Sequence, residues 1–139
     1  MQEKQQIISQ AQVAENIAHV RATIAQAAER TERTVDEITL VAVSKTKPLE
    51  LVQMAYALGV TNFGENRVQD ALPKIEAFHP DDVRWHMIGH LQSNKASKVM
   101  GAFDCVQSVD SLHLAQTLNR YAEERTTRLP ILLQVNISG

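Results

Sequence analysis

A lysine at the end of an apolar segment is the residue whose setting most clearly suggests chemistry. The stretch 38–43 is mainly apolar and β-branched, and Lys45 and Lys47 follow it, which is typical of a buried parallel strand that ends near residue 45. Side chains alternate along a strand, so Val41, Val43 and Lys45 share one face. Apolar neighbours and the charge of Lys47 would favour a neutral amine, which makes Lys45 a candidate nucleophile. The alternative is an ordinary surface lysine that extends into water.

A second group of polar residues occurs in mid-chain, within and after another apolar segment. His86 shares a strand face with His90 and is predicted either to lie near a ligand or to be a structural histidine. Gln92, Asn94 and Lys95 follow and could bind an anion at the start of a helix or form a solvated capping turn. The sequence argues against a metal site, because no cysteine or carboxylate cluster supplies further ligands beside the two histidines.

The remaining candidates carry little chemical signal. Cys105 is the single cysteine, and its apolar neighbours predict a small buried side chain rather than a nucleophile. Asn136 and Ser138 stand alone near the end of the last apolar segment. No glycine-rich dinucleotide or phosphate loop and no G-x-S-x-G motif occurs, so nucleotide-binding and serine-hydrolase functions have no support.

Strand-like and helix-like segments alternate along the chain, which predicts a parallel sheet with right-handed helical crossovers. Strands are expected at 38–45, 60–65, 83–90, 103–109 and 131–138, and helices over the first thirty or so residues and at 48–58, 68–78, 93–100 and 111–121. No linker or composition change divides the chain, so we expect one partial domain over 1–139.

Several local signals mark the ends of these elements. Gly59 and Gly101 are placed to end helices, and Ser111 can cap the start of one. Thr34 and Glu37 have the spacing of a capping box. Pro73 falls within a helical pattern, which predicts a kink or a late helix start.

Five strands fit two architectures. One is an open, doubly wound sheet, and the other is part of a (β/α)8 barrel, which typically needs about 250 residues. In either case the strand 131–138 has no following element to cover it and no charged residue to protect its edge. We therefore expect self-association through open sheet edges.

Composition excludes several partners. The formal net charge is −2, so the basic surface of a nucleic-acid-binding protein is not expected. No apolar run approaches the ~18 residues of a membrane span, and the first residues show no secretory signal. The single cysteine agrees with a reducing compartment, and a cytoplasmic location is expected.

Five motifs together resemble one known family. They are Val-Ser-Lys-Thr-Lys-Pro at 43–48, Phe-Gly-Glu-Asn at 63–66, Trp-His-Met-Ile-Gly-His-Leu-Gln-Ser-Asn-Lys at 85–95, the segment 103–110, and Val-Asn-Ile-Ser at 135–138. Their order and spacing resemble the YggS/PROSC family of pyridoxal phosphate (PLP) homeostasis proteins, from about residue 17 to the C-terminus.

The resemblance implies an α/β fold of the (β/α)8 TIM-barrel type, related to the N-terminal domain of alanine racemase, of which this sequence supplies about five strands. It implies PLP as cofactor, held as a Schiff base on Lys45, with Asn66 beside it. His86 is expected in the same region. In the family, the phosphate is bound largely by a Ser/Gly-rich loop and an Arg-Ile-Gly-like segment from later strands. Neither occurs here, so we expect a truncated homologue with weakened PLP binding.

The function implied by the resemblance is a non-catalytic carrier or regulator of PLP (vitamin B6) and amino-acid pools. One alternative is a PLP-dependent amino-acid racemase, which needs acid/base groups on both faces of the cofactor. In racemases the opposite-face tyrosine comes from a second domain, which this sequence does not contain. Another alternative is a fragment that binds no PLP and only associates with itself.

Overall fold

The structure is a computed structural model that describes residues 8–138. Its elements, in chain order, are α1 (Gln10–Arg30), the short 3-10 turn η1 (Val35–Glu37), β1 (Ala42–Val43), α2 (Leu49–Ala57), β2 (Asn62–Glu65), α3 (Val68–Ala77), β3 (Arg84–Met87), the 3-10 turn η2 (Ser93–Lys95), α4 (Ala96–Val99), β4 (Cys105–Val109), α5 (Leu112–Glu124) and β5 (Ile131–Leu133).

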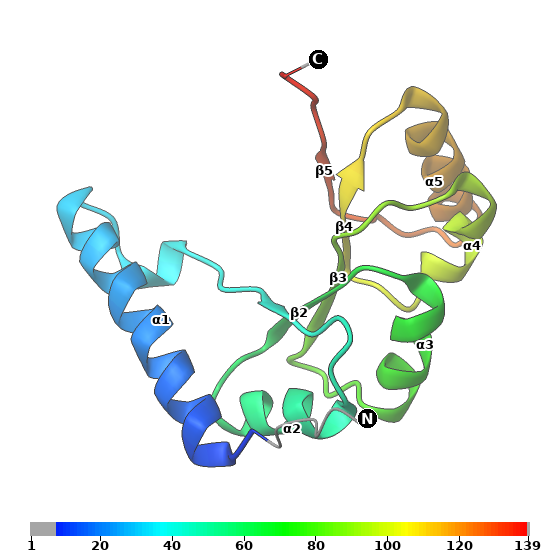
Figure 1. The fold of residues 1–139 in the computed structure, drawn as a ribbon. Helices are drawn as coiled ribbons and strands as arrows, with labels where there is room; N and C mark the ends of the chain where they lie inside the picture. The colour runs from blue at the N-terminus through cyan, green and yellow to red at the C-terminus, as the bar shows by residue number, and fades with distance from the viewer. Residues whose placement is uncertain (1–7, 139) are drawn as a thin grey trace.

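The five strands form one parallel sheet in the order β1-β2-β3-β4-β5. Helices α2 to α5 follow one another in an arc along one side of these strands (Figure 1). A doubly wound sheet reverses its strand order and has helices on both faces, whereas strands of a (β/α)8 barrel follow chain order with all helices outside. The architecture is therefore part of a barrel, and the doubly wound alternative is wrong.

The hydrophobic core lies between the sheet and these outer helices. Phe63, Trp85, Met87 and Val106 point to the helical side and are buried. The rings of Phe63 and Trp85 pack with their centroids 5.5 Å apart, a geometry that contributes about 0.5–1.5 kcal/mol beyond burial. The alternate residues of the same strands point to the other face, which would be the barrel interior. We call this the inner face.

The residues predicted to end or cap helices are confirmed in these roles. Gly59 and Gly101 follow helices with φ of +90° and +83°, a conformation that glycine adopts without steric cost. The Ser111 hydroxyl accepts a hydrogen bond from the backbone N–H of Leu114 at the start of α5. The Glu37 carboxylate accepts the backbone N–H of Thr34 at 2.7 Å.

Three expectations about the elements are wrong. The strands β1 (Ala42–Val43), β3 (Arg84–Met87) and β5 (Ile131–Leu133) are all shorter than expected. Two of them, β1 and β5, are outer strands that pair on one side alone. The β4–β5 pairing also shifts register between Val106 and Val109, which interrupts the ladder. For α3, which begins at Val68 ahead of Pro73, the late start does not occur, and the alternative of a kink at Pro73 stays a prediction.

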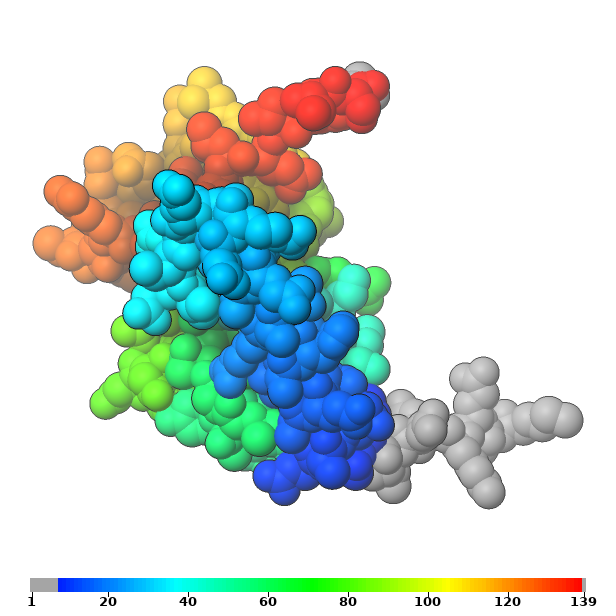
Figure 2. Space-filling model, turned by 90° about the vertical axis from the view of Figure 1, so that its left-hand side faces the viewer, coloured from blue at the N-terminus to red at the C-terminus, as the bar shows by residue number. Residues whose placement is uncertain are grey.

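The chain from β5 onward is largely exposed. Leu133 is 72% exposed and Ile137 is 93% exposed, and Figure 2 shows this last part of the chain extending away from the body of the molecule. Val43 on the inner face of β1 is 52% exposed. Uncovered apolar groups thus occur at the β5 edge and on the inner face. None of the helices within residues 8–138 combines the length and the apolar character that a membrane span needs.

Candidate functional site

Lys45 lies in a tight turn immediately after β1, at the carboxyl edge of the sheet. The Ser44 N–H donates to the Gly64 carbonyl of β2 at 2.9 Å, which is the last bond of the β1–β2 ladder. The Lys47 N–H then donates back to the Ser44 carbonyl at 3.1 Å. Thr46 has a φ of +61°, as at the third position of a type II turn. Lys45 is therefore the second residue of a four-residue turn and not the last residue of a strand.

The expectation that Lys45 stands among apolar neighbours is wrong for the same reason. Its side chain is exposed, and Val43, the preceding residue on the inner face, is itself half exposed. The inner face of β1 is not covered within residues 8–138. The strand pattern did place the Lys45 amine at the correct edge of the sheet. This carboxyl edge is where barrels of this type bind ligands.

A buried ion pair lies behind the turn, on the helical side of the sheet. The Lys74 ammonium of α3 is 2.6 Å from the Glu65 carboxylate of β2, whose side chain is 1% exposed. Lys74 also donates to the Ser44 carbonyl at 2.9 Å, and the Ser44 hydroxyl donates to the same Glu65 oxygen at 3.1 Å. The sequence interpretation missed this group. The sequence did carry a signal: Glu65 lies two residues after Phe63 on the same strand, so its carboxylate points to the same apolar face.

Asn66 comes directly after β2, at the same carboxyl edge of the sheet as Lys45. The register pairs Val43 with Gly64, so Lys45 and Asn66 each lie two residues beyond that pair. Asn66 packs against the backbone of Gly89, where a Cβ atom would lie only 2.3 Å from the Asn66 carbonyl oxygen. The Gly89 carbonyl in turn accepts the Ser108 hydroxyl at 2.6 Å. Glycine is thus required at 89 for β2, β3 and β4 to meet at this edge.

His86 lies on the inner face, one layer further from the carboxyl edge than Lys45, because it pairs in register with Gly64. Its Nε2 is 2.8 Å from the Asn62 side-chain oxygen, and its Nδ1 is 3.0 Å from the Gln107 side-chain nitrogen. These contacts fit a neutral ring that donates from Nε2 and accepts at Nδ1. Burial lowers the pKa of His86, and the nearby Asp104 charge only partly opposes this shift. The ring therefore links three strands as a neutral group.

The other sequence candidates are only partly brought together. Asn66, Gln92 and Lys95 line a small groove of about 160 Å³ between α3 and the chain that follows β3, and Lys95 donates to Gln69 at 3.2 Å. Asn94 is exposed and outside this groove. Asn136 accepts hydrogen bonds from the backbone and hydroxyl of Ser138, two residues away, which is a local turn contact.

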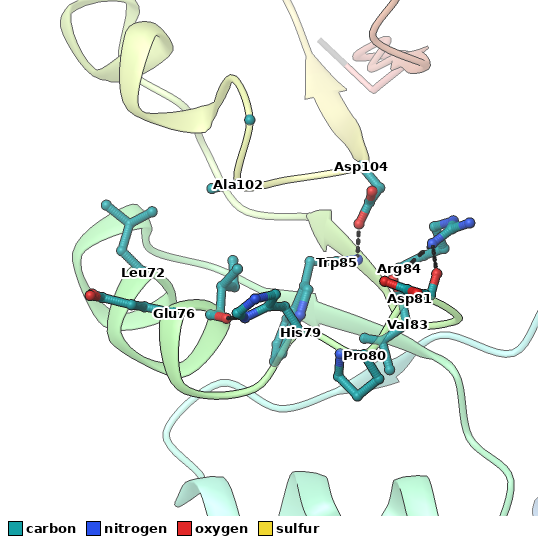
Figure 3. Close-up of a pocket in the computed structure, with 12 residues that line it drawn as sticks. Leu72, Glu76, His79, Pro80, Asp81, Val83, Arg84, Trp85, Ala102 and Asp104 are labelled. Atoms are coloured by element: carbon teal, nitrogen blue, oxygen red, sulfur yellow. Dashed lines mark hydrogen bonds between the residues drawn. The ribbon is translucent and has the colours of Figure 1, made fainter.

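A chemically mixed groove lies at the opposite edge of the sheet from Lys45. It measures about 590 Å³ and is lined by Glu76 and His79 on one side and by Arg84 and Asp104 on the other (Figure 3). The Asp104 carboxylate accepts a hydrogen bond from the Trp85 N–H at 2.8 Å, near the start of β3. Barrels of this type bind ligands at the carboxyl ends of their strands, so this groove is not the candidate site.

Cys105 is half-buried on the inner face of β4, in register with His86, and not fully buried as the sequence suggested. Burial raises the pKa of the Cys105 thiol, and the Asp104 charge raises it further. A thiol held protonated is a poor nucleophile. The structure therefore gives Cys105 a packing role.

The neutral state of His86 predicts a pH dependence of stability. The unfolded chain takes up a proton on this histidine near pH 6.5, whereas the folded chain does so only at lower pH. The free energy of unfolding should therefore fall as pH drops through about 6.5, and the loss should level off below the folded-state pKa. Urea denaturation of His86→Gln should show a smaller fall than wild type. The control variant His113→Gln changes an exposed position on α5 and should behave as wild type. If the free energy of unfolding fell equally with pH in His86→Gln and in wild type, the neutral state of His86 would be contradicted.

Comparison with known proteins gives a consistent result. The family described as "Alanine racemase, N-terminal domain" matches residues 8–139. Two relatives, both named pyridoxal phosphate homeostasis protein, come from Pseudomonas aeruginosa (45% identical over 130 residues) and Escherichia coli (43% over 129 residues). Each match covers 91% of this chain and 55% of the relative, so the chain spans about half their length.

Solved structures agree with this assignment. PipY from Synechococcus elongatus, solved with PLP bound, superposes with a TM-score of 0.78 at 40% identity, over 91% of this chain and 55% of PipY. Alanine racemase from Streptomyces coelicolor superposes with a TM-score of 0.62 over 87% of this chain and 32% of its own, and its 22% identity supports likeness of fold alone. The sequential parallel strands, the outer helices and the match over residues 8–139 lead to one conclusion: the chain belongs to the alanine racemase N-terminal domain family.

Proposed function

We propose that this chain binds PLP through Lys45 and serves PLP and amino-acid homeostasis in the cytoplasm without catalysing a reaction of its own. The observation that carries the proposal is the place of Lys45, an exposed amine at the carboxyl edge of the first strand of a parallel barrel sheet. The names of the relatives and the PLP bound in PipY support the same ligand.

The residues around Lys45 fit such a ligand. PLP, when bound, would supply an aldehyde group with which the Lys45 amine would condense. The amine is exposed and therefore accessible to this aldehyde. We propose that Asn66, at the same edge of the sheet, contacts the ligand, and that His86 supports this region from the layer below through Asn62 and Gln107.

We favour a non-catalytic role over a racemase. Racemization requires groups that exchange protons on both faces of the substrate carbon. The two titratable side chains of the central inner face, His86 and Cys105, both have pKa values shifted toward their neutral forms. Both ring nitrogens of His86 also already have partners within the sheet. Neither group is arranged to exchange a proton with a substrate.

The first prediction of this proposal concerns the reactive amine. Borohydride reduction of the chain mixed with PLP, followed by peptide mapping, should place the pyridoxyl mass on Lys45. Lys45→Ala should abolish the Schiff-base absorption band while changing the free energy of unfolding by less than about 0.5 kcal/mol, because the side chain is exposed. Lys47→Ala is the matched control and should keep the band. A pyridoxyl mass on Lys47 or Lys95, with none on Lys45, would show that the assignment is wrong.

A second prediction concerns the phosphate. Phosphate sites in (β/α)8 barrels generally come from the loops after the seventh and eighth strands, and the structure describes five strands. We therefore propose that this chain binds PLP weakly and prefers it to unphosphorylated pyridoxal by less than about tenfold, since charge-assisted hydrogen bonds to phosphate are few. Titration of both ligands measures this ratio. A strong preference for PLP would contradict this proposal and indicate a phosphate site formed by residues 92–95 or by a second chain.

We also propose that the chain associates with a second copy of itself through β5 and the inner face. Val43, Leu133 and Ile137 are exposed there, and each large aliphatic side chain gains about 1.5–3 kcal/mol when buried. The β5 edge also carries no charged residue to oppose pairing.

Light scattering on dilute protein tests this association. Leu133→Lys should shift the chain toward monomer because it places a charge on the open edge. Leu112→Lys is the matched control, since Leu112 is equally exposed, at 73%, but lies at the start of α5. A wild-type chain that is monomeric in dilute solution and melts cooperatively by circular dichroism would contradict the proposal.

A further inference from the structure

We infer that Glu65 and Lys74 are positioning residues for Lys45. Their buried ion pair fixes the Ser44 carbonyl, and this carbonyl closes the turn that carries Lys45. The inference rests on the proposed function, in which Lys45 is the residue that reacts with PLP. It adds that residues on the helical side of the sheet, which cannot touch a ligand on the inner face, set the position of the reactive amine.

Every polar group of Ser44 is held by this network. Its N–H donates to the Gly64 carbonyl at 2.9 Å, and its hydroxyl donates to Glu65 at 3.1 Å. Its carbonyl accepts two hydrogen bonds, one from the Lys74 ammonium at 2.9 Å and one from the Lys47 N–H at 3.1 Å. Hydrogen bonds therefore hold the peptide group that joins Ser44 to Lys45, at the start of the turn.

The ion pair is largely shielded from water, so its partners have few alternative contacts. Glu65 is 1% exposed and Lys74 is 14% exposed, and a buried carboxylate without its counter-charge is strongly destabilising. The pair Arg33–Glu37 is a useful contrast, since its atoms are 4.0 Å apart and both side chains are more than half exposed. Exposed pairs of that kind contribute little and move freely. The Glu65–Lys74 pair instead has one compact geometry.

The turn itself needs this support. Thr46 adopts a φ of +61°, which is uncommon for a residue with a branched side chain and costs free energy. Such a conformation persists only where the surroundings hold it. The Lys74 bond to Ser44 comes from α3, a separate element, and so ties the turn to the rigid body of the molecule. Without it, the Lys47 N–H bond would have to hold the turn closed alone.

The test compares Lys74→Met with Lys98→Met, a matched loss of one lysine at an exposed position on α4. The first readout needs no ligand: hydrogen exchange of the Lys47 amide, with the Val106 amide of β4 as internal reference. In Lys74→Met the Lys47 amide should exchange at least about tenfold faster while Val106 is unchanged, whereas a purely structural role would speed both equally. The second readout is the PLP affinity measured from the Schiff-base band, which should fall at least about tenfold. Lys98→Met should match wild type in both.

A second variant keeps the test decisive if Lys74→Met fails to fold. Glu65→Leu with Lys74→Met removes both charges together, and such replacements of buried pairs usually preserve stability. This double variant should fold, yet show fast Lys47 exchange and weak PLP binding. The inference is overturned if the folded double variant keeps wild-type exchange at Lys47, or if it exchanges fast but binds PLP as wild type does. If wild type itself forms no Schiff base, the proposed function fails, and the exchange readout alone decides whether the pair fixes the turn.

Discussion

A carboxylate buried beside the core is the constraint on which the candidate site depends. Glu65 lies on the helical side of β2, where an unpaired charge is not tolerated, so Lys74 of α3 must approach it. This approach brings α3 against the ends of β1 and β2, because Lys74 also binds the Ser44 carbonyl. One electrostatic requirement thus sets both the packing of a helix and the path of the chain into the turn that carries Lys45.

The inner face is organised in a different way. It carries Asn62, His86 and Gln107 as a row of neutral hydrogen-bonding groups across β2, β3 and β4. Neutral groups can be half-buried without a counter-charge, provided that their polar atoms are paired. Above this row, towards the carboxyl edge, lie Asn66 and the exposed Lys45. The sheet therefore has a charged pair behind it, a neutral row on its inner face and an exposed lysine at its edge.

The sequence predicted the alternation of strands and helices because each element follows from short-range patterns and from residues such as Gly59 and Ser111. It also predicted the edge at which Lys45 lies, since that depends only on strand direction. The turn at Lys45 could not be predicted, because it depends on a bond from Lys74, which is distant in sequence. The short β5 was missed for a related reason, since an apolar pattern forms a long strand only where partners pair with it.

The hydrogen bonds of Ser44 explain how the backbone at an exposed lysine can still be held in one position. The side chain of Lys45 is exposed, so any restriction on its position has to come from the backbone from which it extends. Backbone precision in turn requires fixed hydrogen bonds on the preceding residue, and Ser44 has them on its amide, carbonyl and hydroxyl groups. The inner face can therefore stay open while the backbone at Lys45 is held at a defined point, because the anchoring groups lie on the opposite side of the sheet.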